Sequence, residues 1–170
     1  MASPTVYSFA PLVGEGAGVL ILGNMPGVVS LEQHRYYAHP RNAFWRITAA
    51  LFGFDALAPY EERVRRLTDA GVAVWDVLAS CRRPGSLDAS VEPASMVANN
   101  FDAFFAAHPT IERVYFNGAA AARNYQRLVR TAPSLPAVRL PSTSPAHTAP
   151  FETKLAAWRH IVEPIPQPLP

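Results

Sequence analysis

The chain has 170 residues, of which 49% are hydrophobic and 16% charged, so it fits one globular domain with a sizeable core better than a disordered chain. Its net charge of +2 rests on arginine, a residue suited to phosphates and planar partners, because Lys154 is the only lysine. The single cysteine, Cys81, excludes an internal disulfide and a cysteine-rich zinc or iron–sulfur site. No apolar stretch approaches a membrane span and no signal peptide is visible, so we expect a cytoplasmic monomer with no membrane partner.

Apolar runs bounded by glycine or proline alternate with segments whose apolar residues recur at helical spacing. The first run, "AGVLILGN", is short and continuously apolar, which is typical of a buried parallel strand. The helix after it should end at Gly53, and the next should begin at Pro59, with acids first and arginines later. The predicted strands span 17–24, 71–77, 111–118 and 137–140, and the predicted helices span 42–53, 59–70, 99–108, 119–130 and 151–162.

Strands that alternate with helices predict an α/β fold, namely a three-layer α/β/α sandwich with a central, mainly parallel four-stranded sheet. We expect one domain over residues 1–163 and a proline-rich C-terminal tail over 164–170. In such sheets ligands bind beyond the carboxyl ends of the strands. The candidate connections are therefore 23–42 "GNMPGVVSLEQHRYYAHPRN", 76–88 "DVLASCRRPGSLD" and 141–148 "PSTSPAHT".

Several kinds of site are excluded by spacing. The glycines of "GEGAG" precede a strand, whereas a dinucleotide fingerprint follows one, and no phosphate-binding GxxxxGK[ST] loop is present. The five histidines are scattered, so we expect neither a metal ion nor a cofactor. Ser144 and His147 lie too close together in one loop for a hydrolase triad, and no nucleophile elbow exists.

The first connection gathers polar and aromatic groups directly after a strand. Its "GNMPG" start can turn backbone N–H groups toward a ligand, as in an anion nest. Tyr36 and Tyr37 can offer a flat surface for a base. His39 and Arg41, with the N-terminus of the next helix, can meet a phosphate. Asn42 begins that helix, and spacing alone favours a helix cap over a catalytic role.

These residues carry a resemblance to a known family. "GNMPGVVSL…YYAHPRNAFW" resembles the uracil-DNA glycosylase superfamily, and within it the hypoxanthine-DNA (deoxyinosine) glycosylase branch. The mismatch-specific uracil and thymine glycosylases share an "HPxNxFW" ending with it. "GVAVWDV…CRRPGSLD" is similar to the strand and loop that read the base edge, and "LPSTSPAHT" to the loop that enters the minor groove. The matching segments span roughly residues 17 to 150, in the expected order.

The resemblance implies roles for particular residues. Better-known members carry Asp or Asn, which orients the attacking water, where this chain has Met25. The deoxyinosine branch shares that departure, and the resemblance makes Asn42 the leading catalytic candidate. The flipped base would stack on Tyr37. The leaving base would be held by Asn42 and by backbone amides from Gly23 through Asn24 to Met25.

Asp76 stands where the superfamily places its base-reading asparagine, so it is a candidate acceptor for the N–H of the base. A structural alternative, in which Asp76 caps a turn or pairs with Arg82, stays equally open. The other expected DNA contacts are Arg82, Arg83, Ser86, Ser142, Ser144 and His147. Of these, Ser142 replaces a catalytic or base-contacting His or Asn. Because Ala146 replaces a bulky wedge, His147 can fill the gap left by the base. The arginine loop can equally be a solvated surface.

We therefore expect a DNA glycosylase that flips out deaminated bases and hydrolyses their N-glycosidic bond, with hypoxanthine preferred. Uracil excision is the alternative, because uracil shows the same keto group beside an N–H. A protein that only binds damaged or single-stranded DNA, and an enzyme of free nucleosides, are alternatives of other classes. Strand-nicking glycosylases use an amine to form a Schiff base. Lys154 is expected to lie away from the site loops, so we expect a monofunctional enzyme.

Overall fold

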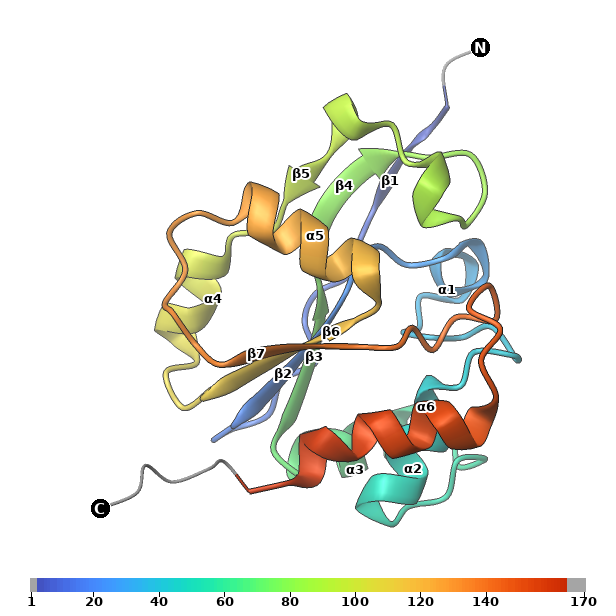
Figure 1. Ribbon diagram of the computed structural model, residues 1–170, viewed down its shortest axis with the longest axis vertical. Coiled ribbons are helices and arrows are strands. Elements are labelled where there is room, and N and C mark those ends of the chain that lie inside the picture. The colour runs from blue at the N-terminus through green and yellow to red at the C-terminus, as the bar shows by residue number, and fades with distance from the viewer. Residues whose placement is uncertain (1–2, 165–170) are drawn as a thin grey trace.

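Four parallel strands form the centre of the molecule, in the order β3 (Val72–Asp76), β2 (Val19–Gly23), β6 (Arg113–Asn117) and β7 (Ala137–Leu140). The computed structural model describes residues 3–164 (Figure 1). All five residues of β2 and all five of β3 are buried, as expected for strands covered on both faces. The four predicted strands and their parallel pairing are confirmed.

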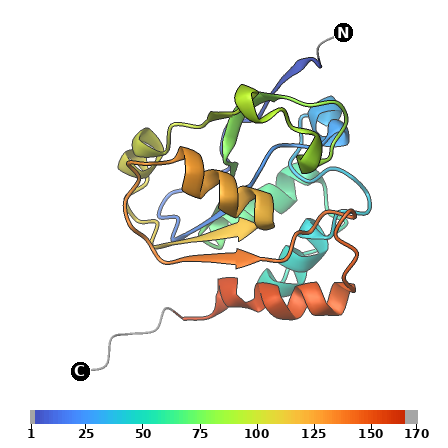
Figure 2. The ribbon, with the colours of Figure 1, turned by 45° about the horizontal axis from the view of Figure 1, so that its top comes forward.

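Helices cover both faces of this sheet, which confirms the three-layer prediction. Helices α4 (Phe101–Ala107) and α5 (Ala119–Leu128) lie on one face. Helices α2 (Phe44–Phe52), α3 (Tyr60–Asp69) and α6 (Phe151–Trp158) lie on the other, and Figure 2 shows α5 and α6 on opposite sides of the sheet. Leu20 and Leu22 of β2 pack toward α4 and α5, whereas Val19 and Ile21 pack toward α2 and α6. Successive strand residues point to opposite faces, so each layer has its own core.

A second, antiparallel sheet was not expected from the sequence. It consists of β1 (Thr5–Tyr7), β4 (Leu78–Arg82) and β5 (Val97–Ala98), in the order β1-β4-β5. Strand β4 begins two residues after β3 ends, so the connection predicted over 76–88 contains a strand. The partners of β4 lie far away along the chain, and local patterns do not reveal such pairing.

A short helix, α1 (Val28–Gln33), interrupts the segment predicted as one long connection. The Ser86 hydroxyl oxygen accepts a hydrogen bond from the Val28 N–H at 2.8 Å, so a residue remote in sequence satisfies the helix end. Three short 3₁₀ helices complete the fold: η1 (Asp88–Ser90), η2 (Pro93–Ser95) and η3 (Arg159–Val162). The last one continues α6, so the helix predicted over 151–162 changes type at its end.

Two connections that follow strands of the main sheet lie at the same side of the molecule. In Figure 1, α1 and the segment between β7 and α6 both lie at the right, beyond the carboxyl ends of the strands. Among residues 3–164, no helix is long and apolar enough to cross a bilayer. The predicted proline-rich tail lies outside the described residues, apart from Pro164.

The buried strands predict a large difference between two leucine substitutions. Leu22 is 0% exposed in β2, whereas Leu57 is 92% exposed in the connection before α3. We expect Leu22→Ala to lower the free energy of unfolding by about 2–5 kcal/mol, because it leaves a cavity between packed layers. The matched Leu57→Ala should change it by less than about 0.5 kcal/mol. Urea unfolding measures both values, and similar losses would contradict this packing.

Candidate functional site

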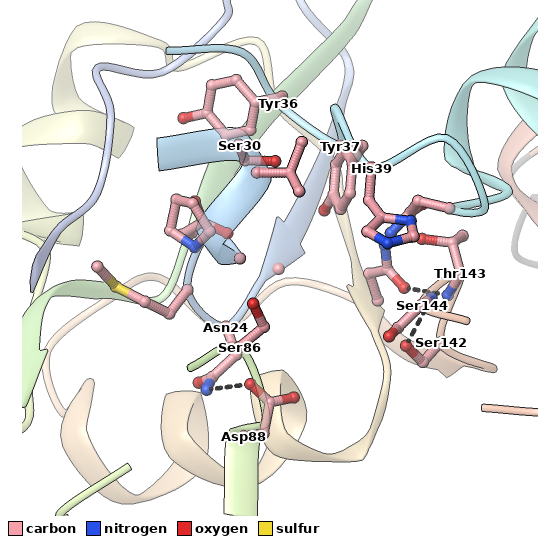
Figure 3. A pocket seen from close by; sticks show the side chains of 18 of the residues that line it. Asn24, Ser30, Tyr36, Tyr37, His39, Ser86, Asp88, Ser142, Thr143 and Ser144 are labelled. Carbon is pink, nitrogen blue, oxygen red and sulfur yellow. Dashed lines mark hydrogen bonds between the residues drawn. The ribbon is translucent and has the colours of Figure 1, made fainter. Parts of the chain in front are cut away.

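A cavity of about 160 Å³ opens at the carboxyl ends of the parallel strands. An apolar cavity of roughly 150 Å³ is large enough for a benzene ring, so this open pocket suits one planar ring system. It is lined by residues that follow all four strands of the main sheet and by the loop that follows β4. These residues are 23–30, Tyr36, Tyr37, His39, Asn42, Asp76, Ser86, Asp88, Asn117 and 142–145 (Figure 3).

The floor of the pocket depends on Gly23, the last residue of β2. A Cβ atom on Gly23 would lie 2.5 Å from Asp76 Oδ1 and 2.8 Å from the Tyr37 hydroxyl, so only glycine allows both oxygens to approach. Asp76 Oδ2 and the Tyr37 hydroxyl are buried and have no hydrogen-bond partner among residues 3–164. Buried polar atoms without partners are rare and costly. Two of them at the floor of an open pocket indicate that a polar ligand group belongs there.

Burial dominates the electrostatics of the floor. Burial and, to a smaller extent, the nearby charge of Asp88 together raise the pKa of Asp76 to about 7, while the charge of Arg83 opposes both effects. Burial, followed by the charge of Asp76, also raises the pKa of Tyr37. Near neutral pH the Asp76 carboxyl is therefore present in both protonation states. It accepts hydrogen bonds when ionised and can also donate one when protonated.

The two neighbouring tyrosines have different environments. Tyr36 is 3% exposed and donates its hydroxyl to the Ala10 carbonyl at 2.8 Å, so its ring belongs to the core and is not a stacking surface. The expectation of a shared flat surface is wrong for Tyr36. Tyr37 adopts a φ of 54°, which is unusual for a bulky residue. One face of its ring stacks on Phe44 with a centroid separation of 4.1 Å, and the ring forms part of the pocket wall.

Asn42 combines a capping contact with a free polar group. Its Oδ1 accepts a hydrogen bond from the Phe44 N–H at 2.9 Å and so satisfies the first N–H of α2, although the N-cap residue of this helix is Ala43 and not Asn42 as predicted. Its Nδ2 donates to no acceptor among the described residues, and Asn42 lines the pocket. Next to it, His39 lines the pocket and accepts the Arg41 N–H through Nδ1. Arg41 itself is exposed and lies outside the pocket lining.

The connection after β7 is fixed to the end of β6 by a residue that sequence analysis did not single out. Asn117 Oδ1 accepts the Thr143 N–H, and Asn117 Nδ2 donates to Thr143 Oγ1, both at 2.9 Å. Ser142 packs against Gly118, where a Cβ would lie 3.0 Å from the Ser142 Cβ. Ser142 and Ser144 consequently line the pocket. The signal for Asn117 was its position near the carboxyl end of the strand predicted over 111–118, where ligands bind in such sheets.

Lys154 lies beside this connection, so the expectation that it is remote from the site loops is wrong. Its Nζ donates to the Ser144 carbonyl at 3.1 Å, and the side chain is buried, with 4% of the residue exposed. Burial and the nearby charge of Arg46 lower its pKa. Helix α6 also holds the start of this loop, because Trp158 Nε1 donates to the Pro141 carbonyl. No pattern in the sequence indicated that α6 packs against this loop.

Arg82, the last residue of β4, and Arg83, which follows it, do not lie in the pocket lining. Arg82 Nε forms an ion pair with Glu92 at 2.7 Å, and no contact with Asp76 is recorded. Arg83 is 2% exposed and donates to the carbonyls of Pro26 and Gly85. Arg83 therefore joins two loops from inside the protein, and its predicted contact with a phosphate is wrong because its side chain is not at the surface.

Two buried amides place a carboxylate at the pocket. Asn124 Nδ2, from α5, donates to Asn24 Oδ1 at 2.8 Å. Asn24 Nδ2 then donates to Asp88 Oδ1 at 3.0 Å, and Figure 3 shows Asn24 and Asp88 joined in this way. Met25, next in the chain, is 8% exposed and packs in the core cluster of α4 and α5. The backbone N–H groups of Asn24 and Met25 donate to no acceptor among the described residues.

Most of the residues predicted for the site are brought together. Ten line the pocket: Gly23, Asn24, Met25, Tyr37, His39, Asn42, Asp76, Ser86, Ser142 and Ser144. Arg41, Arg82 and His147 are not among the lining residues, and His147 is exposed on the loop after β7. Asn117 and Asp88 are pocket residues that sequence analysis missed. Within residues 3–164, no group of three His, Cys, Asp or Glu side chains could hold a metal ion.

Comparison with known proteins identifies similar chains over nearly the whole length. Residues 11–164 match the family model described as the uracil DNA glycosylase superfamily. A hypoxanthine DNA glycosylase of Methanosarcina barkeri is 30% identical over 88% of this chain and 93% of its own. Another hypoxanthine DNA glycosylase, from Methanosarcina acetivorans, is 28% identical over 90% of this chain and 95% of its own. A solution NMR structure of a candidate uracil DNA glycosylase from M. acetivorans has a TM-score of 0.78, with 27% identity, and covers 94% of this chain and 100% of its own.

The raised pKa of Asp76 predicts how stability depends on pH. The carboxyl has a pKa of 3.8 as a free group and about 7 in the folded protein. Between these values the folded state binds more protons than the unfolded state, so the free energy of unfolding falls as pH rises and levels off above about 7. Asp76→Asn removes this contribution. From pH 5 to pH 8 the wild type should lose up to about 3 kcal/mol more than the variant.

Urea unfolding of both proteins at the two pH values measures this difference, because all other titrating groups are common to both. Equal losses would show that Asp76 is ionised throughout this pH range.

Proposed function

Because the chain belongs to the uracil DNA glycosylase superfamily, and is thus a DNA glycosylase, we propose that it excises deaminated bases from DNA, with hypoxanthine preferred. The reaction is hydrolysis of the N-glycosidic bond, which leaves an abasic site for base excision repair. The observation that carries the proposal is the pocket floor, where Asp76 Oδ2 and the Tyr37 hydroxyl are buried and have no hydrogen-bond partner in the described part of the chain. The names of the two curated relatives point to the same base.

The target base must leave the duplex to reach this pocket, at a cost of a few kcal/mol. A deaminated purine mispairs, which lowers that cost. In the pocket, the base lies against the Tyr37 ring, whose other face is already stacked on Phe44. Base–aromatic stacking is worth about 1–3 kcal/mol per base and therefore offsets much of the cost of flipping.

Asp76 reads the edge of the flipped base. Hypoxanthine presents an N–H next to a keto oxygen, and the ionised carboxylate accepts that N–H. Adenine presents a bare nitrogen at the same place, and its lone pair would face the oxygen of the ionised carboxylate, which has no proton to donate. A site whose buried groups lose their partners rejects the wrong edge strongly. Guanine matches the edge but adds an amine, which a tight pocket can exclude. Uracil shows the hypoxanthine pattern and remains the alternative substrate.

The chemistry requires donors for the leaving base, which gains negative charge as the glycosidic bond breaks. Asn42 Nδ2 and the backbone N–H groups of Asn24 and Met25 are free donors near the pocket. Because these groups are fixed before the reaction, they stabilise the developing charge without reorganising. Asn42 is therefore the residue on which we expect the rate to depend most strongly.

Polar and basic residues around the mouth of the pocket are expected to contact the DNA backbone. We assign phosphate contacts to His39, Arg41, Ser142 and Ser144, with Arg82 and Ser86 on the opposite loop. We assign the gap left by the base to His147, which is exposed. These contacts depend on charge and hydrogen bonds to phosphate, so binding should weaken steeply as salt increases.

Base release tests the proposal directly. The protein is incubated, without added metal, with matched duplexes that carry one deoxyinosine or one deoxyuridine, and alkali reveals the abasic sites. We expect faster release from deoxyinosine. Asn42→Ala should lower the single-turnover rate by roughly 100-fold or more, as is usual for a lost catalytic group. Asn100→Ala is the matched control, because Asn100 caps α4 through the Ala103 N–H but is not in the pocket.

Each other outcome selects an alternative. Preferential release of uracil would keep the site and change the substrate. Binding without release of either base would indicate a protein that recognises damage but does not excise it. If Asn42→Ala and Asn100→Ala lowered the single-turnover rate equally, the role of Asn42 would be limited to its hydrogen bond with the start of α2.

The enzyme is further expected to be monofunctional. A glycosylase that also nicks the strand needs a free amine for a Schiff base. The only lysine amine donates to the Ser144 carbonyl and is not among the groups that line the pocket. Borohydride treatment during the reaction should therefore trap no adduct at Lys154. A trapped protein–DNA adduct that maps to Lys154 and disappears in Lys154→Met would contradict the monofunctional assignment.

A further inference from the structure

Hydrolysis needs a group that accepts a proton from the attacking water, and the pocket offers few acceptors. Asn42 Oδ1 already accepts the Phe44 N–H, which leaves its Nδ2 as the free end of the amide. The thioether of Met25 is only a weak acceptor. Asp76 lies at the buried floor, 3% exposed, where the base edge is read. Asp88 is the other carboxylate that lines the pocket, and it lies on the solvent side.

The contacts of Asp88 fix one oxygen and leave the other free. Asn24 Nδ2 donates to Asp88 Oδ1 at 3.0 Å. The Asn24 amide cannot turn around without losing its own partner, because its Oδ1 accepts from Asn124 Nδ2 at 2.8 Å. Asn24 is 5% exposed and Asn124 2%, so this orientation is set inside the protein. Within residues 3–164, no partner is recorded for Asp88 Oδ2, which remains available to a water molecule.

The negative charge of Asp88 is unfavourable for DNA binding, so its presence at the pocket suggests a catalytic role. A carboxylate at the mouth of a DNA-binding pocket repels phosphates and raises the pKa of Asp76 below it. That same charge is useful only when positive charge builds on the sugar, as the bond to the base breaks. An interaction that strengthens in the transition state raises the rate rather than the affinity.

We propose that Asp88 is the carboxylate that orients and deprotonates the attacking water in this enzyme. The inference rests on the proposed glycosylase function. The water oxygen forms a bond to the anomeric carbon, and its proton passes to Asp88 Oδ2. The bond from that carbon to the base nitrogen breaks, and its electron pair leaves with the base, which then takes up a proton. The products are the free base and an abasic sugar, with one water consumed.

The test is a pair of carboxylate-to-amide substitutions. Asp88→Asn keeps the shape and removes the charge at the pocket. Asp69→Asn removes the same charge from the exposed last residue of α3. Because α3 precedes β3, Asp69 lies at the amino-terminal end of the strands, and the pocket lies at their carboxyl end. Single-turnover base release, affinity for the undamaged duplex by fluorescence anisotropy, and Tm are measured for both variants and the wild type.

We expect Asp88→Asn to slow base release by roughly 100-fold or more, the usual contribution of a general base, while its affinity for DNA stays equal or rises. Asp69→Asn should match the wild type in rate. A single-turnover rate for Asp88→Asn within about threefold of the wild type would overturn the proposal, since a general base contributes at least about 100-fold. If the wild type itself releases neither hypoxanthine nor uracil, the proposed function fails instead.

Chemical rescue separates a reacting carboxylate from a structural one. Asp88→Ala opens space beside Asn24, and sodium formate can place a small carboxylate there. At constant ionic strength, formate should accelerate base release by Asp88→Ala, and sodium chloride should not. A slow Asp88→Ala variant that formate does not accelerate would make Asp88 a structural residue and would refute the assignment.

Discussion

The pocket depends on the missing side chain of Gly23. The ends of β2 and β3 lie side by side in the parallel sheet, with Gly23 opposite Asp76. A Cβ on Gly23 would clash with Asp76 Oδ1 and with the Tyr37 hydroxyl, so any other residue would push these oxygens out of the floor. Glycine thus allows a strand end, a carboxylate and an aromatic ring to meet in a space where a planar base can lie.

Around this floor, buried polar contacts hold three separate connections in fixed positions. Arg83 ties the loop after β4 to the carbonyl of Pro26. Asn117 ties the loop after β7 to the end of β6, and Lys154 supports the same loop from α6. Breaking such buried contacts is costly because it leaves groups without partners. The sheet and these ties place the pocket residues before any substrate arrives, as preorganised catalysis requires.

The sequence alone predicted the main sheet, the helical layers and ten of the pocket residues, because these depend on local periodicity and on the rule that sites follow strand ends. It could not predict β4, whose partners β1 and β5 are distant in sequence, or α1, whose first turn is capped by Ser86. The predictions for Arg83 and Lys154 were wrong for the same reason: a charged side chain is predicted to be exposed unless its tertiary partners are known. Asp88 ends the connection predicted over 76–88, but only its contact with Asn24 and its place in the pocket lining show that it belongs to the site.

In the proposed reaction, a deaminated base leaves the duplex and lies on Tyr37 with its N–H directed at Asp76. A crystal structure of the Asn42→Ala variant bound to a duplex with one deoxyinosine tests that claim most directly. We predict hypoxanthine in the pocket, one face against the Tyr37 ring, with the base N–H within hydrogen-bond distance of Asp76 Oδ2. A base that remains stacked in the duplex, or DNA bound across another face of the protein, would contradict the account.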